Sequence, residues 1–416
     1  MASGQRTTPK APARPAWFTP GVGGIGSASF LADVGHEVPT ALLPSFVTST
    51  LGAPAAALGL IEGISEGLAG AGRFVGGALA DDPHRRRAVA VGGYTTTALL
   101  SSLIGAAGNV VQVGVLRGVS WAARGLRVPA RNALLADVVP AGAYGRAYGF
   151  ERTMDNLGAI AGPLLALALV SLFSIRTAIL LSVVPGLLAA AAIVFAIRQA
   201  KLPKPAQRRK LRLQVRAVLR HGQLGRLLGA FTAFEIGNLA ATLLILRATD
   251  LLTPAHGAQA ATALALGLYT AYNLAATVVS FPAGRLADQL GPRGPRLVVA
   301  GGVAAFLLAY LTFAFTPAIV GVLAVAFVLA GIGIGAAETA QTAAVAALAP
   351  EQLRGSAFGL LATIQAGGNV AASAIAGALY TFASPTIAFS YVAAWMLVAL
   401  IGLAATHAPT HAPRAA

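Results

Sequence analysis

Long hydrophobic segments recur along the whole chain and are separated by short polar links. A helix needs about 20 mainly apolar residues to cross the hydrocarbon core of a bilayer, and most of these segments reach that length. We expect twelve membrane-spanning helices, near residues 22–48, 56–80, 88–107, 110–139, 147–170, 176–197, 224–247, 260–287, 297–315, 318–348, 356–381 and 386–406. The pattern therefore predicts an all-α membrane protein of twelve transmembrane helices in two six-helix bundles.

The predicted organisation has five parts. A short tail (1–21) precedes a six-helix bundle (22–197), a basic linker (198–223) follows, and a second six-helix bundle (224–406) leads to a final tail (407–416). No stretch of domain size is polar enough to fold in water by itself.

Composition supports this class and excludes others. Of the 416 residues, 56% are hydrophobic and only 11% are charged, whereas a soluble domain carries roughly 25% charged residues. The net charge is +16, but no soluble basic surface exists for nucleic acid, so we expect none to bind. The chain has no cysteine, which excludes disulfides and thiol chemistry.

The positive charges fall mostly on one side of the predicted spans. Links on that side hold Arg85, Arg86, Arg87, Arg146, Arg293, Arg296 and Arg354, together with the linker. The positive-inside rule assigns this side and both termini to the cytoplasm, so we expect a multi-pass protein of the inner membrane.

Basic residues recur every four positions in the linker. They are Arg208, Arg212, Arg216 and Arg220, and Leu211, Val215, Val218 and Leu219 form the opposite stripe. This spacing predicts an amphipathic helix lying on anionic lipids. A simple positively charged tether explains the composition nearly as well.

The two halves repeat one another. Asp33-Val34-Gly35-His36 matches Glu235-Ile236-Gly237-Asn238, and Gly77-Ala78-Leu79-Ala80-Asp81 matches Gly284-Arg285-Leu286-Ala287-Asp288. A third match pairs Pro140, Gly145, Ala147, Tyr148 and Gly149 with Pro350, Gly355, Ala357, Phe358 and Gly359. Three matches in one order indicate a six-plus-six duplication, which is typical of transporters with a site between the halves.

The second of these repeats resembles a motif of the major facilitator superfamily. That family carries G-x-L-x-D-x-x-G-R/K after its second helix and often after its eighth. Here the positions are Gly77, Asp81 and Arg85 in the first copy and Gly284, Asp288 and Arg293 in the second. The first copy departs from the motif at Asp82 and His84. The resemblance implies a gate on the cytoplasmic face, where glycine permits close helix packing and the aspartate lies near a helix N-terminus.

The fifth predicted helix carries a further resemblance. Gly158, Gly162 and Pro163 match the G-x-x-x-G-P signature of the drug–proton antiporters of this family, although Ala166 and Leu167 stand where that signature ends in Gly-Gly. This partial match favours export.

Charged residues within the spans are the candidates for function. An isolated charge at mid-bilayer costs about 2.5–3.5 kcal/mol on insertion scales, so such residues face the bundle interior. The interiors of the third, sixth, ninth and twelfth spans hold none, and the family resemblance implies that the first, fourth, seventh and tenth line the cavity. Our proton-coupling candidates are Asp33, His36, Glu37 and Glu235, and our substrate-binding candidates are Arg117, Arg124, Asn238, Glu338, Gln341 and Asn273. Permanent structural ion pairs are the competing interpretation for these charges.

Motifs of other classes are missing or out of context. Gly21 to Gly26 fits G-x-G-x-x-G but follows a Pro-rich tail instead of a strand, and no P-loop or catalytic triad is present. We therefore expect neither an enzyme nor an ATP-driven pump, and no cofactor or metal.

The sequence leads to one function hypothesis and two alternatives. The first is a monomeric secondary transporter that exports a small organic molecule against protons. An uptake symporter for an organic anion, with the arginines of the fourth helix as its site, is one alternative. A non-transporting membrane sensor or lipid-handling protein is the other.

Overall fold

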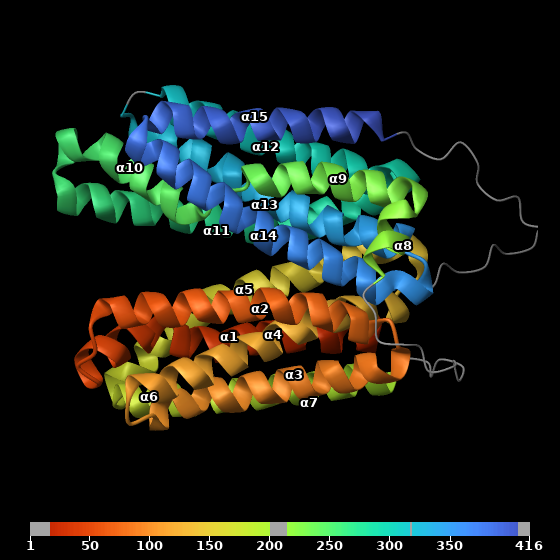
Figure 1. The fold of residues 1–416 in the computed structure, drawn as a ribbon, viewed down its shortest axis with the longest axis horizontal. Helices are drawn as coiled ribbons and strands as arrows, with labels where there is room; N and C mark the ends of the chain where they lie inside the picture. The colour runs from red at the N-terminus through yellow and green to blue at the C-terminus, as the bar shows by residue number, and fades with distance from the viewer. Residues whose placement is uncertain (1–16, 200–213, 317, 407–416) are drawn as a thin grey trace, which may run out of the picture.

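The structure, a computed structural model, describes residues 17–199, 214–316 and 318–406. Two helical bundles lie side by side, with the helices of each running roughly parallel to a common axis (Figure 1). Residues 1–16 and 407–416 of the two predicted tails and residues 200–213 of the predicted linker are outside the described residues.

The first half contains six rods, each formed by one helix or by two consecutive helices. They are α1 (Pro20–Ser45), α2 (Ala55–Ala80), α3 (Pro83–Leu103), α4 (Val110–Val138), α5 (Tyr144–Leu172) and the pair α6 (Ile175–Leu181) and α7 (Val183–Gln199). A π-helical turn (Phe46–Thr50) follows α1, and 3-10 turns follow α3 (Ile104–Ala106) and precede α5 (Ala141–Ala143).

The second half repeats this arrangement after the short helix α8 (Val215–Arg220). Its rods are the pair α9 (Gly222–Gly237) and α10 (Ala241–His256), then α11 (Ala258–Gln289), α12 (Gly294–Phe315), α13 (Val320–Leu348), α14 (Arg354–Phe382) and α15 (Pro385–Ala405). Two 3-10 turns (Gly291–Arg293 and Glu351–Leu353) precede α12 and α14. The twelve-helix fold predicted from the sequence is confirmed.

Within the described residues, nine helical segments are long and apolar enough to cross a membrane on length and composition alone. The three remaining rods are α1, α2 and α4, which carry much of the intramembrane charge noted in the sequence. Their charged residues line the central cavity or form ion pairs within the protein, as the site below shows.

Polar caps set where several helices begin. Backbone N–H groups donate to side-chain oxygens of residues just outside the helix, at distances of 2.9–3.3 Å. The accepting residues are Thr19 (α1), Asp82 (α3), Asn109 (α4), Ser174 (α6) and Ser384 (α15). Each cap satisfies a backbone donor that has no partner within its helix.

The seventh span differs from the single helix predicted over 224–247. The helix stops at Gly237, resumes at Ala241 and continues to His256. The freed backbone groups bind α14: the Ala240 N–H donates to Ser373 Oγ (2.8 Å), and Asn369 Nδ2 donates to the Asn238 carbonyl (3.0 Å). A broken helix inside a membrane is stable only when neighbouring groups satisfy its backbone in this way.

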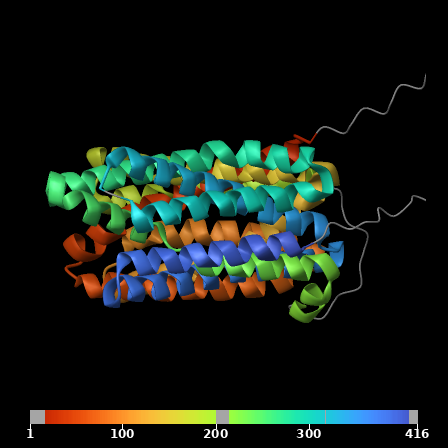
Figure 2. The same ribbon diagram turned by 90° about the horizontal axis from the view of Figure 1, so that it is seen from above.

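The halves meet mainly where α2 packs on α14 and α5 packs on α11. The start of α1 and the end of α15 lie at the same end of the molecule as α8 (Figures 1 and 2). We call this the linker end, and the other the opposite end.

Candidate functional site: a central cavity and the contacts that close it

A cavity of about 890 Å³ lies between the two halves. Its walls come from α1, α2, α4 and α5 on one side and from α9, α13 and α14 on the other, and residue Asn238 of the break after α9 also contributes. The predicted lining spans, the first, fourth, seventh and tenth, all take part, joined by the second, fifth and eleventh. Helices α3, α6, α7, α12 and α15 supply none of its lining residues.

Arg131 organises the charges of the first half. Its Nη1 lies 2.7 Å from Glu151 Oε1 and 3.4 Å from Asp155 Oδ1, and it also donates to Ser29 Oγ (3.1 Å). Ser29 in turn donates to Glu151 (2.7 Å). One buried arginine thus joins α1, α4 and α5, and its acids are compensated, as burial requires.

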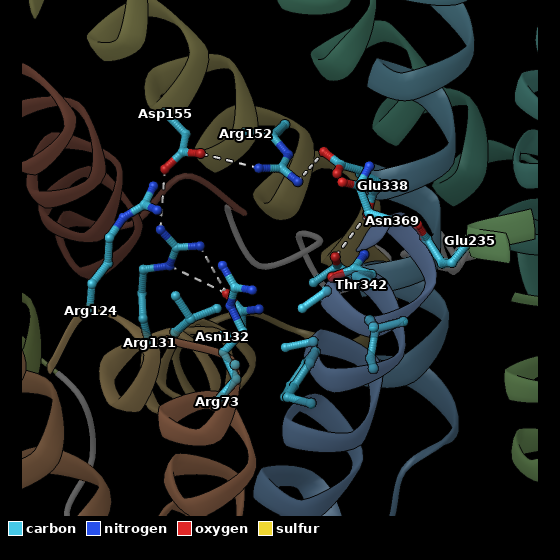
Figure 3. Close-up of a pocket in the computed structure, with 18 of the residues that line it drawn as sticks. Arg73, Arg124, Arg131, Asn132, Arg152, Asp155, Glu235, Glu338, Thr342 and Asn369 are labelled. Atoms are coloured by element: carbon cyan, nitrogen blue, oxygen red, sulfur yellow. Dashed lines mark hydrogen bonds and ion pairs between the residues drawn. The ribbon is translucent and has the colours of Figure 1, made fainter. Parts of the chain in front are cut away.

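Among the described residues, one ion pair connects this network with the other wall of the cavity. Arg152 on α5 contacts Asp155 of its own helix (3.1 Å) and also pairs with Glu338 on α13 in the other half (Figure 3). Because the two acids belong to different halves, Arg152 connects the charges of both walls.

The second half surrounds its acid with amides. Glu235 on α9 accepts hydrogen bonds from Asn238 Nδ2 (3.1 Å) and Gln341 Nε2 (3.2 Å), and Gln365 Nε2 supports Gln341 (3.0 Å). Glu235 is only 2% exposed and lines the cavity. Within the described chain, no arginine or lysine forms an ion pair with it.

The three coupling candidates of α1 form a short chain. His36 Nδ1 lies 3.4 Å from Asp33, and His36 Nε2 lies 3.3 Å from Glu37, with the imidazole edge-on to Trp121. Only Asp33 of the three lines the cavity. His36 contacts Asp33 on the side away from the cavity lining, and Glu37 contacts His36.

Two glycines pack against the cavity acids in matching positions. A Cβ at Gly158 would lie 2.8 Å from Asp33 Cβ, and a Cβ at Gly368 would lie 2.4 Å from Glu235 Cβ. Gly162 makes the same kind of approach to Glu37 (2.4 Å). The antiporter-like motif therefore brings α5 against the acids of α1, with Pro163 inside the helix.

The substrate-binding candidates divide into two groups. Arg124, Asn238 and Glu338 line the cavity, whereas Arg117, Gln341 and Asn273 do not. Arg117 is enclosed by Glu62 (3.0 Å), Thr40 (3.0 Å) and the ring of Trp121. Asn273 donates to Tyr269 of its own helix (3.0 Å).

Other lining residues were not among the sequence candidates. They include Arg73, Asn132, Tyr148, Arg152, Asp155, Thr342 and Asn369. For Arg73 a signal existed, since it lies seven residues after Glu66 and so on the same face of α2. Asn369 is an amide within a predicted span, as the candidate Asn273 is, so a signal existed for it as well, whereas Thr342 carries none that distinguishes it from an ordinary helix position.

Asp81 and Asp288 hold the halves together at the linker end. Asp81 accepts the Ser356 N–H (2.7 Å) and the Ser356 hydroxyl at the start of α14. Asp288 accepts the N–H groups of Gly145 (2.7 Å) and Arg146 (3.0 Å) at the start of α5, and Arg146 Nε (2.8 Å). Each aspartate thus caps a helix of the opposite half. Burial raises the pKa of Asp81, and the hydrogen bonds from Ser356 oppose that rise.

Glycines allow this approach. A Cβ at Gly145 would lie 2.1 Å from the Gly284 oxygen, and one at Gly359 would lie 2.5 Å from Gly77 Cα. Any side chain at these positions would push the halves apart. Tyr148 and Phe358, whose rings lie 5.9 Å apart, line the cavity next to these contacts.

The motif arginines differ between the copies. Arg85 lies near Asp82 (3.5 Å), while its neighbour Arg86 is buried and donates to Asp137 and to the Ala80 carbonyl. Arg293, nine residues after Gly284 as Arg86 is after Gly77, is exposed.

A polar cavity between two pseudo-symmetric six-helix bundles, with paired closing contacts at one end, is the architecture of a secondary transporter. The profile of the Major Facilitator Superfamily matches residues 25–268 and 227–416, and the chain belongs to this family of membrane transporters, which are not enzymes.

Relatives agree with this assignment. An uncharacterised MFS-type transporter of Methanocaldococcus jannaschii is 27% identical over 370 residues, which cover 88% of this chain and 90% of the relative. An uncharacterised protein of Mycobacterium tuberculosis strain H37Rv is 27% identical over 407 residues, covering 97% and 96%.

Solved structures share the fold. The Escherichia coli fucose:proton symporter has a TM-score of 0.71 at 18% identity, covering 93% of this chain and 98% of that one. A bacterial homologue of the iron transporter ferroportin, in an outward-facing state, scores 0.72 at 15% identity (93% and 99%). The human organic anion transporter MFSD10 scores 0.70 at 15% identity (92% and 99%).

Proposed function

We propose that the protein is a proton-coupled secondary transporter that exports a small organic molecule by alternating access. The central cavity is the substrate site in this proposal. The observation that carries the proposal is Glu235, a buried acid that lines the cavity with amides as its hydrogen-bond partners.

The orientation follows from the distribution of arginines. Arg85, Arg86, Arg146, Arg293 and Arg354 gather at the linker end, so we place this end and both termini in the cytoplasm of an inner membrane. In this orientation the contacts of Asp81 and Asp288 close the cytoplasmic side, and the cavity is reached from outside. Rocking of the halves would break these contacts and open the other side.

Proton coupling is assigned to Asp33 and Glu235. Both line the cavity, and they occupy matching positions in the two halves. An ionised carboxylate that has only amide partners is costly to bury, so Glu235 is suited to take up a proton in one state and release it in another. His36 and Glu37 lie behind Asp33 and would tune it.

Packing supports the assignment to an antiporter. Gly158 of the antiporter-like motif lies directly against Asp33, and its counterpart Gly368 lies against Glu235. A sliding movement of α5 or α14 would therefore change the surroundings of a coupling acid, which links helix movement to proton transfer.

Lipid contact is a further part of the proposal. Arg216 and Arg220 of α8 are exposed, whereas Val218 is buried. Exposed arginines at the cytoplasmic surface attract anionic headgroups. We propose that a single chain suffices for transport, because the cavity is complete within one copy.

The test uses purified protein in oriented proteoliposomes, with a panel of labelled organic compounds and an imposed pH gradient. Glu235→Gln and Asp33→Asn should abolish gradient-driven transport but retain exchange of labelled for unlabelled substrate. Glu351→Gln, at an exposed acid of the linker end, is the matched control and should transport normally. Full gradient-driven transport by both cavity variants would rule out these coupling sites, and transport of every substrate without response to pH would rule out proton coupling.

A further inference from the structure

We infer that the transported molecule carries an anionic group, such as a carboxylate, that binds between Arg73 and Arg124. This inference rests on the transport function proposed above. It follows from which charges of the cavity already have partners.

The acids of the cavity are all engaged. Glu151 and Asp155 contact Arg131, Glu338 contacts Arg152, and Glu235 is held by amides. Glu66 accepts a hydrogen bond from Trp121 Nε1 (2.9 Å), and Asp33 lies beside His36. A cationic substrate would have to displace one of these partners to reach a carboxylate.

Three arginines are in a different position. Arg73 on α2 and Arg124 and Arg127 on α4 line the cavity, and none of them forms an ion pair with an acid in the described part of the chain. Arg127 is only 4% exposed and lies over the ring of Tyr94, with 4.1 Å from its Cζ to the ring centroid, so Arg73 and Arg124 are the two that a ligand can reach more readily. Arg124 has a ring contact with Trp121, with 5.6 Å from its Cζ to the ring centroid. Figure 3 shows the Arg73 side chain directed into the cavity and the Arg124 side chain extending towards Asp155 and Arg131, on the side opposite Glu338, Thr342 and Asn369.

Electrostatics then favour an anion. Among the described residues, neither of these two guanidinium groups has an acid within ion-pair distance, and an anion would supply that contact without breaking an existing pair. Two arginines can also bind one carboxylate through several charge-assisted hydrogen bonds. Asn132, Asn369 and Thr342 also line the cavity, and each has hydrogen-bonding capacity beyond the contact it makes within the protein, which suits neutral polar parts of a ligand.

Trp121 offers a local reporter. The chain has three tryptophans, so the double variant Trp17→Phe/Trp395→Phe leaves Trp121, next to Arg124, as the single one. The probes are three compounds with the same ring and different charge: cyclohexanecarboxylate, cyclohexylmethylammonium and cyclohexylmethanol. Titration of the purified double variant should give a saturable change in Trp121 fluorescence with the carboxylate alone.

Substitutions locate the binding. Arg73→Gln and Arg124→Gln, each made in the double variant, should weaken carboxylate binding by about tenfold or more, the effect of losing about 1.4 kcal/mol. Arg124→Lys, which keeps the charge, should recover part of the loss, and Arg226→Gln, at an exposed arginine of α9, should have no effect. Equal binding of the amine or the alcohol, no saturable change with the carboxylate, or unchanged affinity in both glutamine variants would each overturn the inference.

The two proposals fail separately. If labelled cyclohexanecarboxylate binds as expected but does not cross the membrane of the proteoliposomes under any pH gradient, the anion site stands and proton-coupled transport is rejected. If cationic or neutral compounds of the panel are carried and the carboxylate is not bound, transport stands and the anion site is rejected.

Discussion

The two halves of the protein place different chemistry at equivalent positions. Helices α4 and α13 begin at residues 110 and 320, and α5 and α14 begin at residues 144 and 354, a separation of 210 in both cases. The same separation pairs Arg131 with Gln341 and Asp155 with Gln365. The charged network of the first half therefore corresponds to an amide network in the second.

This difference gives each half a distinct role. In the first half, Arg131 fixes Glu151 and Asp155 by strong charge–charge contacts, so their protonation is costly to change. In the second half, Gln341 and Asn238 hold Glu235 by neutral hydrogen bonds that persist whether or not the acid carries a proton. The first half thus has a rigid charged framework, and the second has an acid suited to exchange its proton.

The largest effect that we expect is a difference in stability between a variant of the charged network and a variant of the amide network. Arg131→Ala leaves the buried Glu151 without its cation and leaves Asp155 with Arg152 alone, which costs about 3–5 kcal/mol of the free energy of unfolding. Gln341→Ala removes one neutral hydrogen bond to Glu235 and costs about 1–3 kcal/mol. Melting of both variants in detergent should show the larger decrease for Arg131→Ala.

A second variant checks the origin of that decrease. Removing the acids as well, in Arg131→Ala/Glu151→Gln/Asp155→Asn, should restore much of the melting temperature, because no unpaired charge then remains buried. Equal melting of the two single variants, or no recovery in the triple variant, would show that Arg131 does not act through these charges.

The sequence predicted one side of this comparison better than the other. Glu151 and Asp155 lie four residues apart, so helical geometry alone places them on one face with Gly158. The pair of Arg152 with Glu338 joins residues from different halves, and no local spacing reveals it. The break after Gly237 was also missed, because Ser373 and Asn369, which stabilise it, lie far along the chain on α14.

The gate motifs provide a second contrast, with a smaller expected effect. Arg86 is 1% exposed and donates to Asp137 and to the Ala80 carbonyl, whereas Arg293 is exposed. The reason lies in α4 and α13. Asp137 lies near the end of α4, and its counterpart 210 residues later, near the end of α13, is Ala347. The second copy therefore lacks the acid that buries the arginine of the first.

Removal of these arginines should have unequal results. Arg86→Gln loses charged hydrogen bonds and should lower the free energy of unfolding by about 1.5–3 kcal/mol. Arg293→Gln should leave the melting temperature unchanged. A comparable decrease in both variants, measured by melting in the same detergent, would mean that Asp137 does not account for the difference.

The smallest effects concern the two aspartates that close the linker end. Asp81→Ala and Asp288→Ala each remove the cap that an aspartate of one half provides for a helix of the other half. Such a cap stabilises the closed form by about 0.5–2 kcal/mol. Such a loss shifts the balance between closed and open forms by roughly two- to thirtyfold, which is enough to impair transport without preventing expression. We expect the larger shift for Asp288→Ala, because Asp288 also binds the charged side chain of Arg146.

The chain has no cysteine, so Thr342→Cys in the cavity wall supplies a single labelling site. A membrane-impermeant maleimide added from the linker side should label this cysteine faster in both alanine variants than in the parent. Asp82→Ala is the matched control, since Asp82 caps α3 of its own half and makes its cap without joining the halves. Unchanged labelling in both variants, or equally faster labelling in the control, would contradict a gate built on Asp81 and Asp288, because the predicted shift requires caps that join the halves.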